Sequence, residues 1–153
     1  MRLEQTILKN NFRALVVRTG PLFDSWDADN FLTGYLNLIR PGRNVRIDDS
    51  AIISVTYIPD MVNASLDLLL DDAEGIWHLV NRGETCHAGL LRHTAAAARL
   101  DPQRVIHRPI GRAAREAAPP CPAYRVLGSI RGGLLPPLEE AADRYLRDFL
   151  TFR

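Results

Sequence analysis

Hydrophobic residues fall into two kinds of runs along the chain, and the first kind predicts strands. Short apolar stretches bounded by turn residues occur at residues 13–18, 45–48 and 75–80, and residues 104–108 form one more candidate strand. The run at 13–18 is rich in β-branched residues and ends before Gly20-Pro21, which predicts a strand buried on both faces. Such strands are typical of parallel sheets covered by helices.

The second kind of run has apolar residues at i, i+3 and i+4, which predicts amphipathic helices. The predicted helices are the tail of a helix at 3–10, then 26–39, about 60–70 with Met61, Leu66, Leu69 and Leu70 facing inward, about 86–98, and 138–149. Residues 113–122 are rich in Pro and Ala and predict an extended surface loop. The fold class is therefore α/β, with a small sheet or part of a larger one and flanking helices.

Composition narrows the domain count, the partners and the location. The chain has 153 residues, 46% of them hydrophobic, which predicts a single domain over residues 1–153 with one sizeable core. The 19 basic residues nearly balance the 18 acidic ones and are scattered, so we expect no nucleic acid and no membrane as partner. The chain has no secretory leader pattern and no run of about eighteen apolar residues, so we expect a cytoplasmic protein.

The motifs of nicotinamide-dependent reductases are missing from the sequence. None of the ten glycines forms a GxGxxG or GxxGxxG turn, which brings the backbone close to a pyrophosphate. No Tyr is followed four residues later by Lys, the pair that lowers the pKa of a catalytic phenol. His87 and His93 are six residues apart, the wrong spacing for two metal ligands on one helix. We expect no catalytic residue, no bound cofactor and no metal in the isolated chain.

Segments that follow one another along the chain carry a recognisable pattern. Residues 14–23 are similar to a strand ending in Arg-Thr-Ser-Trp, and residues 54–61 are similar to Ser-Pro-Thr-Tyr-x-x-Asp-Leu. Residues 75–81 are similar to Gly-hydrophobic-Tyr/Trp-His-Leu, and residues 122–127 and 134–138 to closing Arg-Pro and Leu-Pro elements. In this order the segments resemble the dTDP-4-dehydrorhamnose reductase family of extended short-chain dehydrogenases.

The resemblance implies that the chain corresponds to the C-terminal, sugar-nucleotide-binding half of such a reductase, starting just after its catalytic Tyr-Lys helix. The implied fold is a small partial Rossmann-like sheet with flanking helices. The isolated half is expected to bind a dTDP-sugar. NADPH is implied only together with a partner that supplies the Rossmann half, and the implied reaction is then reduction of the 4-keto group of a dTDP-6-deoxyhexulose.

The chain departs from the family pattern at several positions where a ligand would be expected. The departures are Gly20-Pro21 for Ser-Trp, His87 for an aromatic residue that is often Trp, Cys121 for Arg, Arg125 for Ser, and Gly128 for Asp. An arginine contributes bidentate phosphate recognition, and a cysteine cannot replace it.

Motif positions and strand ends select five candidate substrate-binding residues: Arg18, Thr19, Thr56, Tyr57 and Arg125. Four of the five, all except Thr19, also have a structural interpretation. Thr56 and Tyr57 precede a helix, where capping and packing would explain them equally well. A charge at Arg18, at the end of a buried strand, needs either a phosphate or a carboxylate such as Asp48 or Asp49. Arg125 could supply a replacement phosphate contact or could simply be solvated.

Three hypotheses about function follow from the sequence. In the first, which we favour, the chain is a sugar-nucleotide-binding module without turnover. In the second, it is half of a split NADPH-dependent reductase that a separate Rossmann polypeptide completes, because a lone half would leave an apolar sheet edge for that partner, or for a second copy, to cover. In the third, it is an interaction remnant that binds no nucleotide.

Overall fold

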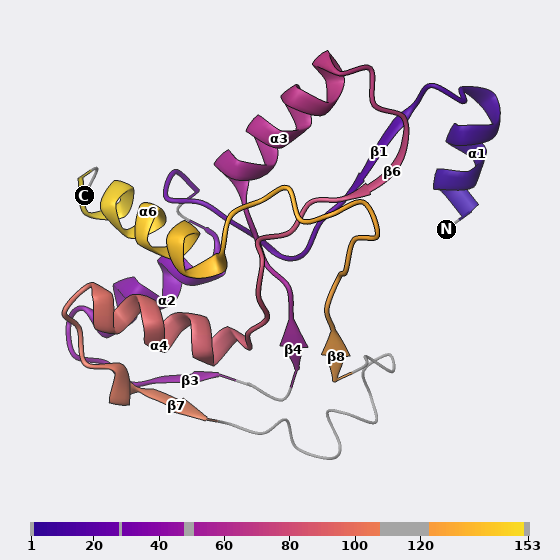
Figure 1. Cartoon of the computed structure of the whole chain (residues 1–153). Coiled ribbons are helices and arrows are strands. Elements are labelled where there is room, and N and C mark those ends of the chain that lie inside the picture. The colour runs from indigo at the N-terminus through magenta and orange to yellow at the C-terminus, as the bar shows by residue number, and fades with distance from the viewer. Residues whose placement is uncertain (1, 28, 48–50, 108–122, 152–153) are drawn as a thin grey trace.

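The computed structural model describes residues 2–27, 29–47, 51–107 and 123–151 (Figure 1). Its elements, in chain order, are α1 (Arg2–Asn10), β1 (Leu15–Arg18), β2 (Leu22–Phe23), α2 (Phe31–Ile39), β3 (Val45–Ile47), β4 (Ile52–Ile53), β5 (Thr56–Tyr57), α3 (Ile58–Leu70), β6 (Gly75–His78), α4 (His87–Ala97), the 3-10 turn η1 (Pro102–Arg104), β7 (Val105–His107), β8 (Tyr124–Arg125) and α6 (Leu138–Thr151). The predicted helices and longer strands are all present. The loop predicted at 113–122 lies outside the described residues.

Every named strand pair is parallel, as expected for an α/β fold. The pairs are β1 with β6, β2 with β5, β3 with β7, and β4 with β8. Strands β2, β4, β5 and β8 contain two residues each, too few for a period-two hydrophobic pattern to reveal. These four strands were therefore not predicted.

Residues 52–57, which include β4 and β5, form a central segment bonded to β2, to β8 and to the chain that follows β6. Thr56 N–H donates to Pro21 C=O at 2.9 Å, and Val55 C=O accepts from Asn81 N–H at 3.0 Å. Farther back, Ile53 and Thr85 exchange both backbone hydrogen bonds. The segment thus connects the chain that follows β1 to the chain that follows β6, and it places the carboxyl ends of these two strands beside it.

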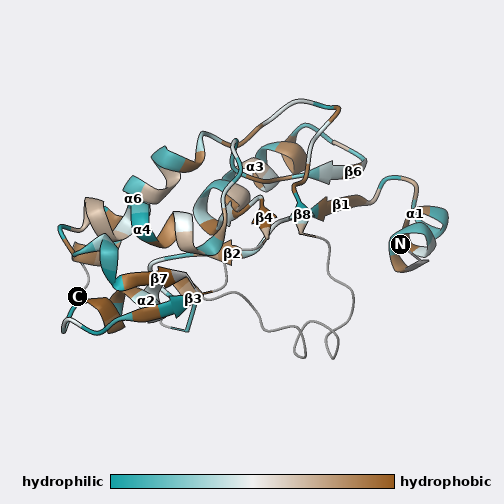
Figure 2. Cartoon of the chain, turned by 90° about the horizontal axis from the view of Figure 1, so that it is seen from below, coloured by the Kyte–Doolittle hydropathy of each residue, from teal (hydrophilic) through white to brown (hydrophobic). Residues whose placement is uncertain are grey.

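The apolar side chains gather in two clusters of unequal size. The larger cluster joins α2, α4 and α6 to β3, β5 and β7, and its largest fully buried members include Phe23, Tyr57, Tyr145 and Phe149. The smaller one has Leu68, Leu79 and Leu135 at its centre, with β1 and β6 packed against it. Helix α1 lies at the far end of the molecule from α2, α4 and α6, beyond β1 (Figures 1 and 2).

Helix α2 begins later than the sequence pattern predicted, at Phe31 rather than near Trp26. Asn30 caps it, because its Oδ1 accepts from the backbone N–H groups of Leu32 and Thr33 at 3.0 and 3.1 Å. Trp26 stays exposed in the preceding turn. The predicted start was too early because the apolar pattern alone did not reveal the Asn30 cap.

Two burial predictions near β1 were wrong. Strand β1 is half-buried rather than buried on both faces, since β6 is its one strand neighbour among the described residues. On α3, Leu66, Leu69 and Leu70 point away from the core, and the inward side is formed by Met61 and Leu68 with small neighbours. Nothing in the described part of the chain covers the outer face of this helix.

Within residues 2–27, 29–47, 51–107 and 123–151, no helix combines the length and the apolar character that crossing a bilayer requires.

Candidate functional site

A cavity of about 350 Å³ opens where α2, α4, β3 and β8 meet. Three aromatic rings, two aliphatic side chains and one guanidinium line it: Phe31, Tyr35, Ile47, Ala51, His87 and Arg125. We call this cavity the aromatic pocket. Phe31 and Tyr35 are one helical turn apart on α2, and His87 is the first residue of α4, so the two helices supply the rings.

The rings and the charge of the aromatic pocket suit a ligand with a flat base and an anionic group. Phe31 and His87 meet edge to face, with centroids 5.0 Å apart and planes at 82°. The exposed Arg125 side chain has no carboxylate partner among the described residues. A guanidinium in this state can make paired hydrogen bonds to phosphate oxygens.

Arg18 is bound to a partner that the sequence analysis did not name. Its guanidinium forks onto the Glu4 carboxylate on α1, with Nε–Oε1 at 2.8 Å and Nη2–Oε2 at 2.7 Å. This bond holds the pKa of Glu4 below its usual range and raises that of Arg18. The predicted partners Asp48 and Asp49 lie outside the described residues, so the described contacts assign Arg18 to tying α1 to the end of β1.

The side chain of His78, on the neighbouring strand β6, contacts the Arg18 guanidinium. Its Nε2 lies 3.3 Å from Nη1 of Arg18, which can only donate, so Nδ1 carries the proton and donates to Gly128 C=O at 2.5 Å. Both nitrogens of a neutral ring are thereby satisfied. The described contacts therefore give His78 a structural role between Arg18 and Gly128.

Thr56 is fully buried and connects two neighbouring segments. Its hydroxyl donates to Leu79 C=O at 2.9 Å and accepts from Gly20 N–H at 3.1 Å. A Cβ at Gly20 would lie 2.1 Å from Ser54 C=O, so only glycine allows this approach. The replacement of Ser by Gly after Thr19 therefore has a packing reason in this chain.

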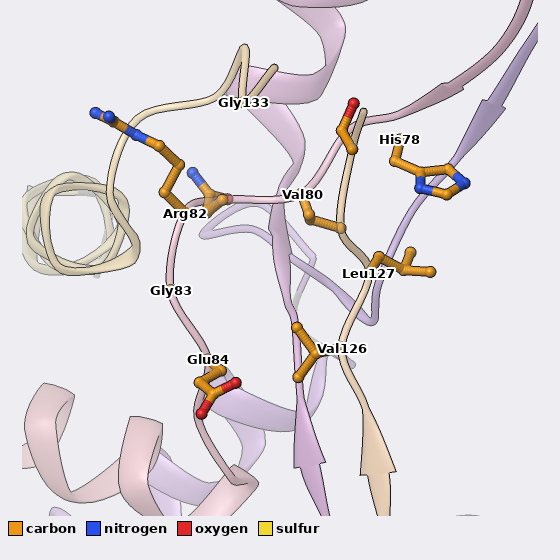
Figure 3. A pocket seen from close by; sticks show the side chains of 10 residues that line it. His78, Val80, Arg82, Gly83, Glu84, Val126, Leu127 and Gly133 are labelled. Carbon is orange, nitrogen blue, oxygen red and sulfur yellow. The ribbon is translucent and has the colours of Figure 1, made fainter. Parts of the chain in front are cut away.

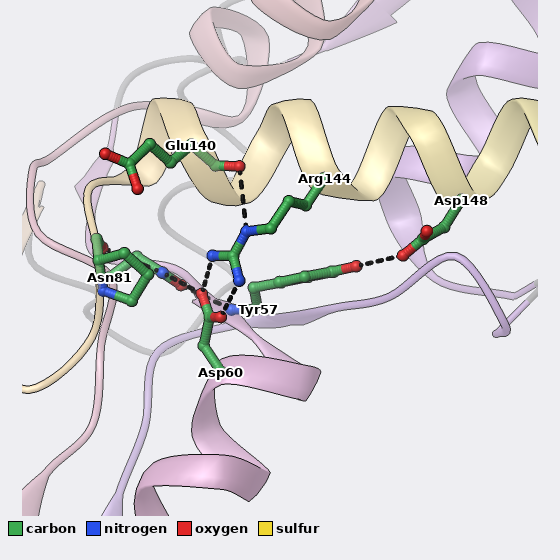
Figure 4. Close-up of polar contacts among 7 residues, drawn as sticks. Tyr57, Asp60, Asn81, Glu140, Arg144 and Asp148 are labelled. Atoms are coloured by element: carbon green, nitrogen blue, oxygen red, sulfur yellow. Dashed lines mark hydrogen bonds and ion pairs between the residues drawn. The ribbon is translucent and has the colours of Figure 1, made fainter.

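Tyr57 and Asp60 belong to a polar network that fastens helix α6 (Figure 4). Arg144 of α6 pairs with the buried Asp60 carboxylate through two bonds of 2.5 and 2.7 Å. Asn81 donates to Asp60 at 2.8 Å and accepts from Tyr57 N–H at 2.8 Å. Burial, together with a hydrogen bond to Asp148, raises the pKa of the Tyr57 phenol far above its usual value, so the phenol stays neutral.

A second cavity, of about 310 Å³, lies between the chain that follows β6 and residues 126–133 (Figure 3). Most of its polar side chains have protein partners. His78 and Asn81 are bound as described above, and Glu84 accepts from the Tyr124 hydroxyl at 2.5 Å. Arg82 also lines the cavity, but its side chain points away from Val126 and Leu127. The cavity therefore offers a ligand few polar groups for directional binding.

The five residues predicted to bind substrate do not line one cavity. Arg125 lines the aromatic pocket, whereas Tyr57 faces α6 and Thr56 is enclosed in the central segment. Arg18 and Thr19 lie at and just after the carboxyl end of β1, about where open α/β sheets bind ligands.

Phe31 and Tyr35 were missed as site residues because their spacing also fits the buried face of a helix. His87 had been noticed only as a departure from the family pattern. The signal that could have selected all three was an aromatic side chain that stays partly exposed, and this depends on tertiary contacts.

Comparisons with known proteins agree with this architecture. Residues 1–131 match the model of the RmlD substrate binding domain. The dTDP-4-dehydrorhamnose reductase of Mycolicibacterium smegmatis is 32% identical over 137 residues, which cover 87% of this chain and 41% of that protein.

Two solved structures share the fold. The dTDP-4-dehydrorhamnose reductase of Bacillus anthracis, in complex with NADP, has a TM-score of 0.77 at 21% identity and covers 95% of this chain and 51% of its own. The enzyme of the same name from Yersinia enterocolitica has a TM-score of 0.77 at 12% identity, with 95% and 53% covered. The chain thus spans about half the length of the relatives it matches.

The parallel strand pairs and flanking helices of this chain share the fold of these reductase structures. The chain belongs to the family of the RmlD substrate binding domain, found in dTDP-4-dehydrorhamnose reductases. The sequence holds neither a glycine-rich phosphate turn nor a Tyr-x-x-x-Lys pair.

Proposed function

We propose that this chain binds a dTDP-deoxyhexose in the aromatic pocket and has no catalytic activity by itself. The observation that carries the proposal is the joint presence of Phe31, Tyr35 and His87 with the Arg125 guanidinium in one open cavity. The rings would hold the thymine base through stacking and edge contacts. Arg125 would take the diphosphate, in place of the arginine that the family carries where this chain has Cys121.

The other candidate residues have different parts in this proposal. Arg18, Thr56 and Tyr57 are already bound to protein partners and support the site rather than contact the ligand. Thr19 lies beside them at the strand end, and its hydroxyl is the group among the four that we assign to the sugar.

The test is a calorimetric and thermal-shift titration of the purified chain with dTDP, dTDP-rhamnose and NADPH. A ligand that binds only the folded state stabilises it by about 2.7 kcal/mol at one hundred times its Kd. We expect both dTDP compounds to raise the melting temperature and NADPH to leave it unchanged. Arg125→Ala should abolish most of the shift, while Arg147→Ala on the exposed side of α6 should keep it. If no dTDP ligand binds, the chain is an interaction remnant instead.

A second candidate function, half of a split reductase, is favoured by the surface around β1. Leu3 of α1 is 74% exposed and Phe12 is 77% exposed, and within the described part of the chain β1 and β6 pair only with each other. Apolar groups and sheet edges left in this state are what a Rossmann polypeptide would cover. The matched relatives are about twice as long as this chain.

Mixing tests the second candidate. A Rossmann polypeptide that carries GxxGxxG and Tyr-x-x-x-Lys should co-elute with this chain and show NADPH-dependent reduction of a dTDP-4-keto-6-deoxyhexose only in the mixture. Two chains that elute separately and remain inactive together would contradict a split enzyme.

A further inference from the structure

Arg125 lies in a strand that is too short to define its own register. Strand β8 pairs with β4 over two residues. Its backbone is held by Ile52 N–H, which donates to Ala123 C=O at 2.7 Å, and by Ser54 N–H, which donates to Arg125 C=O at 3.4 Å. Side chains alternate between the two faces of a strand, so a slip of one residue would turn Arg125 away from the aromatic pocket.

A buried hydroxyl supplies the bond that this short ladder lacks. Ser54 is 1% exposed, and its Oγ accepts from Leu127 N–H at 3.0 Å, just beyond the end of β8. In a parallel ladder the backbone acceptor for Leu127 N–H would be Ser54 C=O, which instead lies against Gly20. A side chain therefore continues the pairing where the backbone cannot.

Ser54 is itself held firmly in place. The Ser54 C=O lies so close to Gly20 that a Cβ on Gly20 would not fit. The backbone N–H of Gly20 also donates to the hydroxyl of Thr56, two residues after Ser54. The Ser54 hydroxyl therefore has a fixed position relative to the end of β1. The bond to Leu127 transmits that position to the chain that carries Arg125.

We propose that Ser54 is a positioning residue for nucleotide binding, because its hydroxyl fixes the register of β8 and thereby places the Arg125 guanidinium at the aromatic pocket. The inference rests on the proposed function, since the placement of Arg125 affects affinity only if a diphosphate binds there.

A double-mutant cycle tests the inference, with dTDP as the probe and calorimetry as the readout. Ser54→Ala and Arg125→Ala should each weaken dTDP binding by roughly tenfold, the equivalent of one lost strong contact. The double variant should bind no more weakly than Arg125→Ala alone, because Ser54 acts through Arg125. Two effects that simply add would overturn the inference.

Two further variants separate positioning from loss of structure. Ser65→Ala removes a hydroxyl that bonds only within α3, to Met61 C=O at 2.7 Å, and should leave dTDP affinity unchanged. Ser54→Cys keeps the space filled with a poor acceptor, so it should reproduce the weaker binding even if Ser54→Ala does not fold. Amide exchange at Leu127 should be faster in both Ser54 variants.

The outcomes distinguish this inference from the proposed function. A wild-type chain that does not bind dTDP refutes both. A wild-type chain that binds dTDP and is weakened by Arg125→Ala, but not by either Ser54 variant, refutes only the positioning role.

Discussion

The helical lobe of α2, α4 and α6 and the region of α1, β1, β6 and α3 differ in how their apolar side chains are covered. In the lobe, Tyr145 stacks on Phe149 with centroids 5.8 Å apart, and both side chains are essentially without solvent contact. In the β1–β6 region the buried centre is small, and Leu69 and Leu70 of α3 are 59% and 83% exposed.

The helical lobe thus covers most of its own apolar side chains, whereas the region of α1, β1, β6 and α3 leaves large apolar side chains exposed. Helices α2, α4 and α6 pack against each other and bury most of their apolar side chains. Strands β1 and β6 have only each other as ladder partners in the described part of the chain, and α1 is attached mainly through polar contacts such as the Arg18–Glu4 fork. Mutations should therefore have very different effects in the two regions.

The largest difference is expected from the same substitution made in each region. Leu91→Ala, at a fully buried position of α4, should lower the free energy of unfolding by about 3 kcal/mol, through lost burial and a residual cavity. Leu69→Ala, on the exposed face of α3, should change it by less than about 0.5 kcal/mol. Urea unfolding followed by circular dichroism measures both. Equal losses would show that α3 is covered in solution.

The next effect concerns the ion pair that joins α6 to the start of α3. Arg144→Met leaves the buried Asp60 carboxylate with Asn81 as its remaining partner among the described contacts. Removing one member of such a pair should cost about 2–3 kcal/mol, less than for a fully buried pair because Arg144 is partly exposed. Arg147→Met, at an exposed position of α6 just after Arg144, is the control. It should leave the free energy of unfolding nearly unchanged in the same urea measurement.

A smaller effect is expected where the two regions meet. Gly20→Ala forces a methyl group against Ser54 C=O, and the resulting shift should cost about 1–3 kcal/mol. Gly34→Ala on α2, where a Cβ meets nothing within 4 Å, should instead stabilise the helix by up to about 1 kcal/mol. In thermal unfolding, Gly20→Ala should lower the melting temperature and Gly34→Ala should raise it. A Gly20→Ala protein as stable as wild type would mean that residues 52–57 shift to accommodate the methyl group at little cost in free energy.

The smallest effect is the pH dependence of α1 attachment. Arg18 lowers the pKa of Glu4 in the folded chain, so the ion pair stabilises the attachment fully above the usual Glu value of 4.5. That contribution is lost as the pH falls through the lower folded pKa. The protection factors of the α1 amides, which correct for the pH dependence of the intrinsic exchange rate, should therefore fall at acidic pH in wild type. In Arg18→Gln they should already be low at neutral pH and change little on acidification.

Periodicity predicted the longer elements because each contains enough residues to show a pattern. Helices α3, α4 and α6 and strands β1 and β6 were all expected near their observed bounds. The two-residue strands β4, β5 and β8 were not, since their hydrogen bonds depend on neighbours far away in the chain. The predicted start of α2 was wrong for a related reason, because the Asn30 cap rather than the apolar spacing sets where the helix begins.

The candidate site was predictable only in part. Arg125 was selected from its place in a closing motif, and the structure places it in a cavity with three rings. Phe31 and Tyr35 could not be told from core residues, because helical spacing indicates which face they share but not whether that face is covered. Arg18 was correctly expected to need a counter-charge, but its partner Glu4 comes from a helix whose position no local pattern defines.

The sequence by itself determined the α/β class, the order of the main elements, the family and the lack of the nicotinamide-binding motifs, because these depend on local patterns and on motifs read along the chain. Only the tertiary structure decided that Gly20 must be glycine, that Thr56 and Tyr57 are held by protein partners, and that Ser54 anchors the strand of Arg125. Each of these depends on contacts between segments many residues apart, and such contacts exist only once the chain has folded.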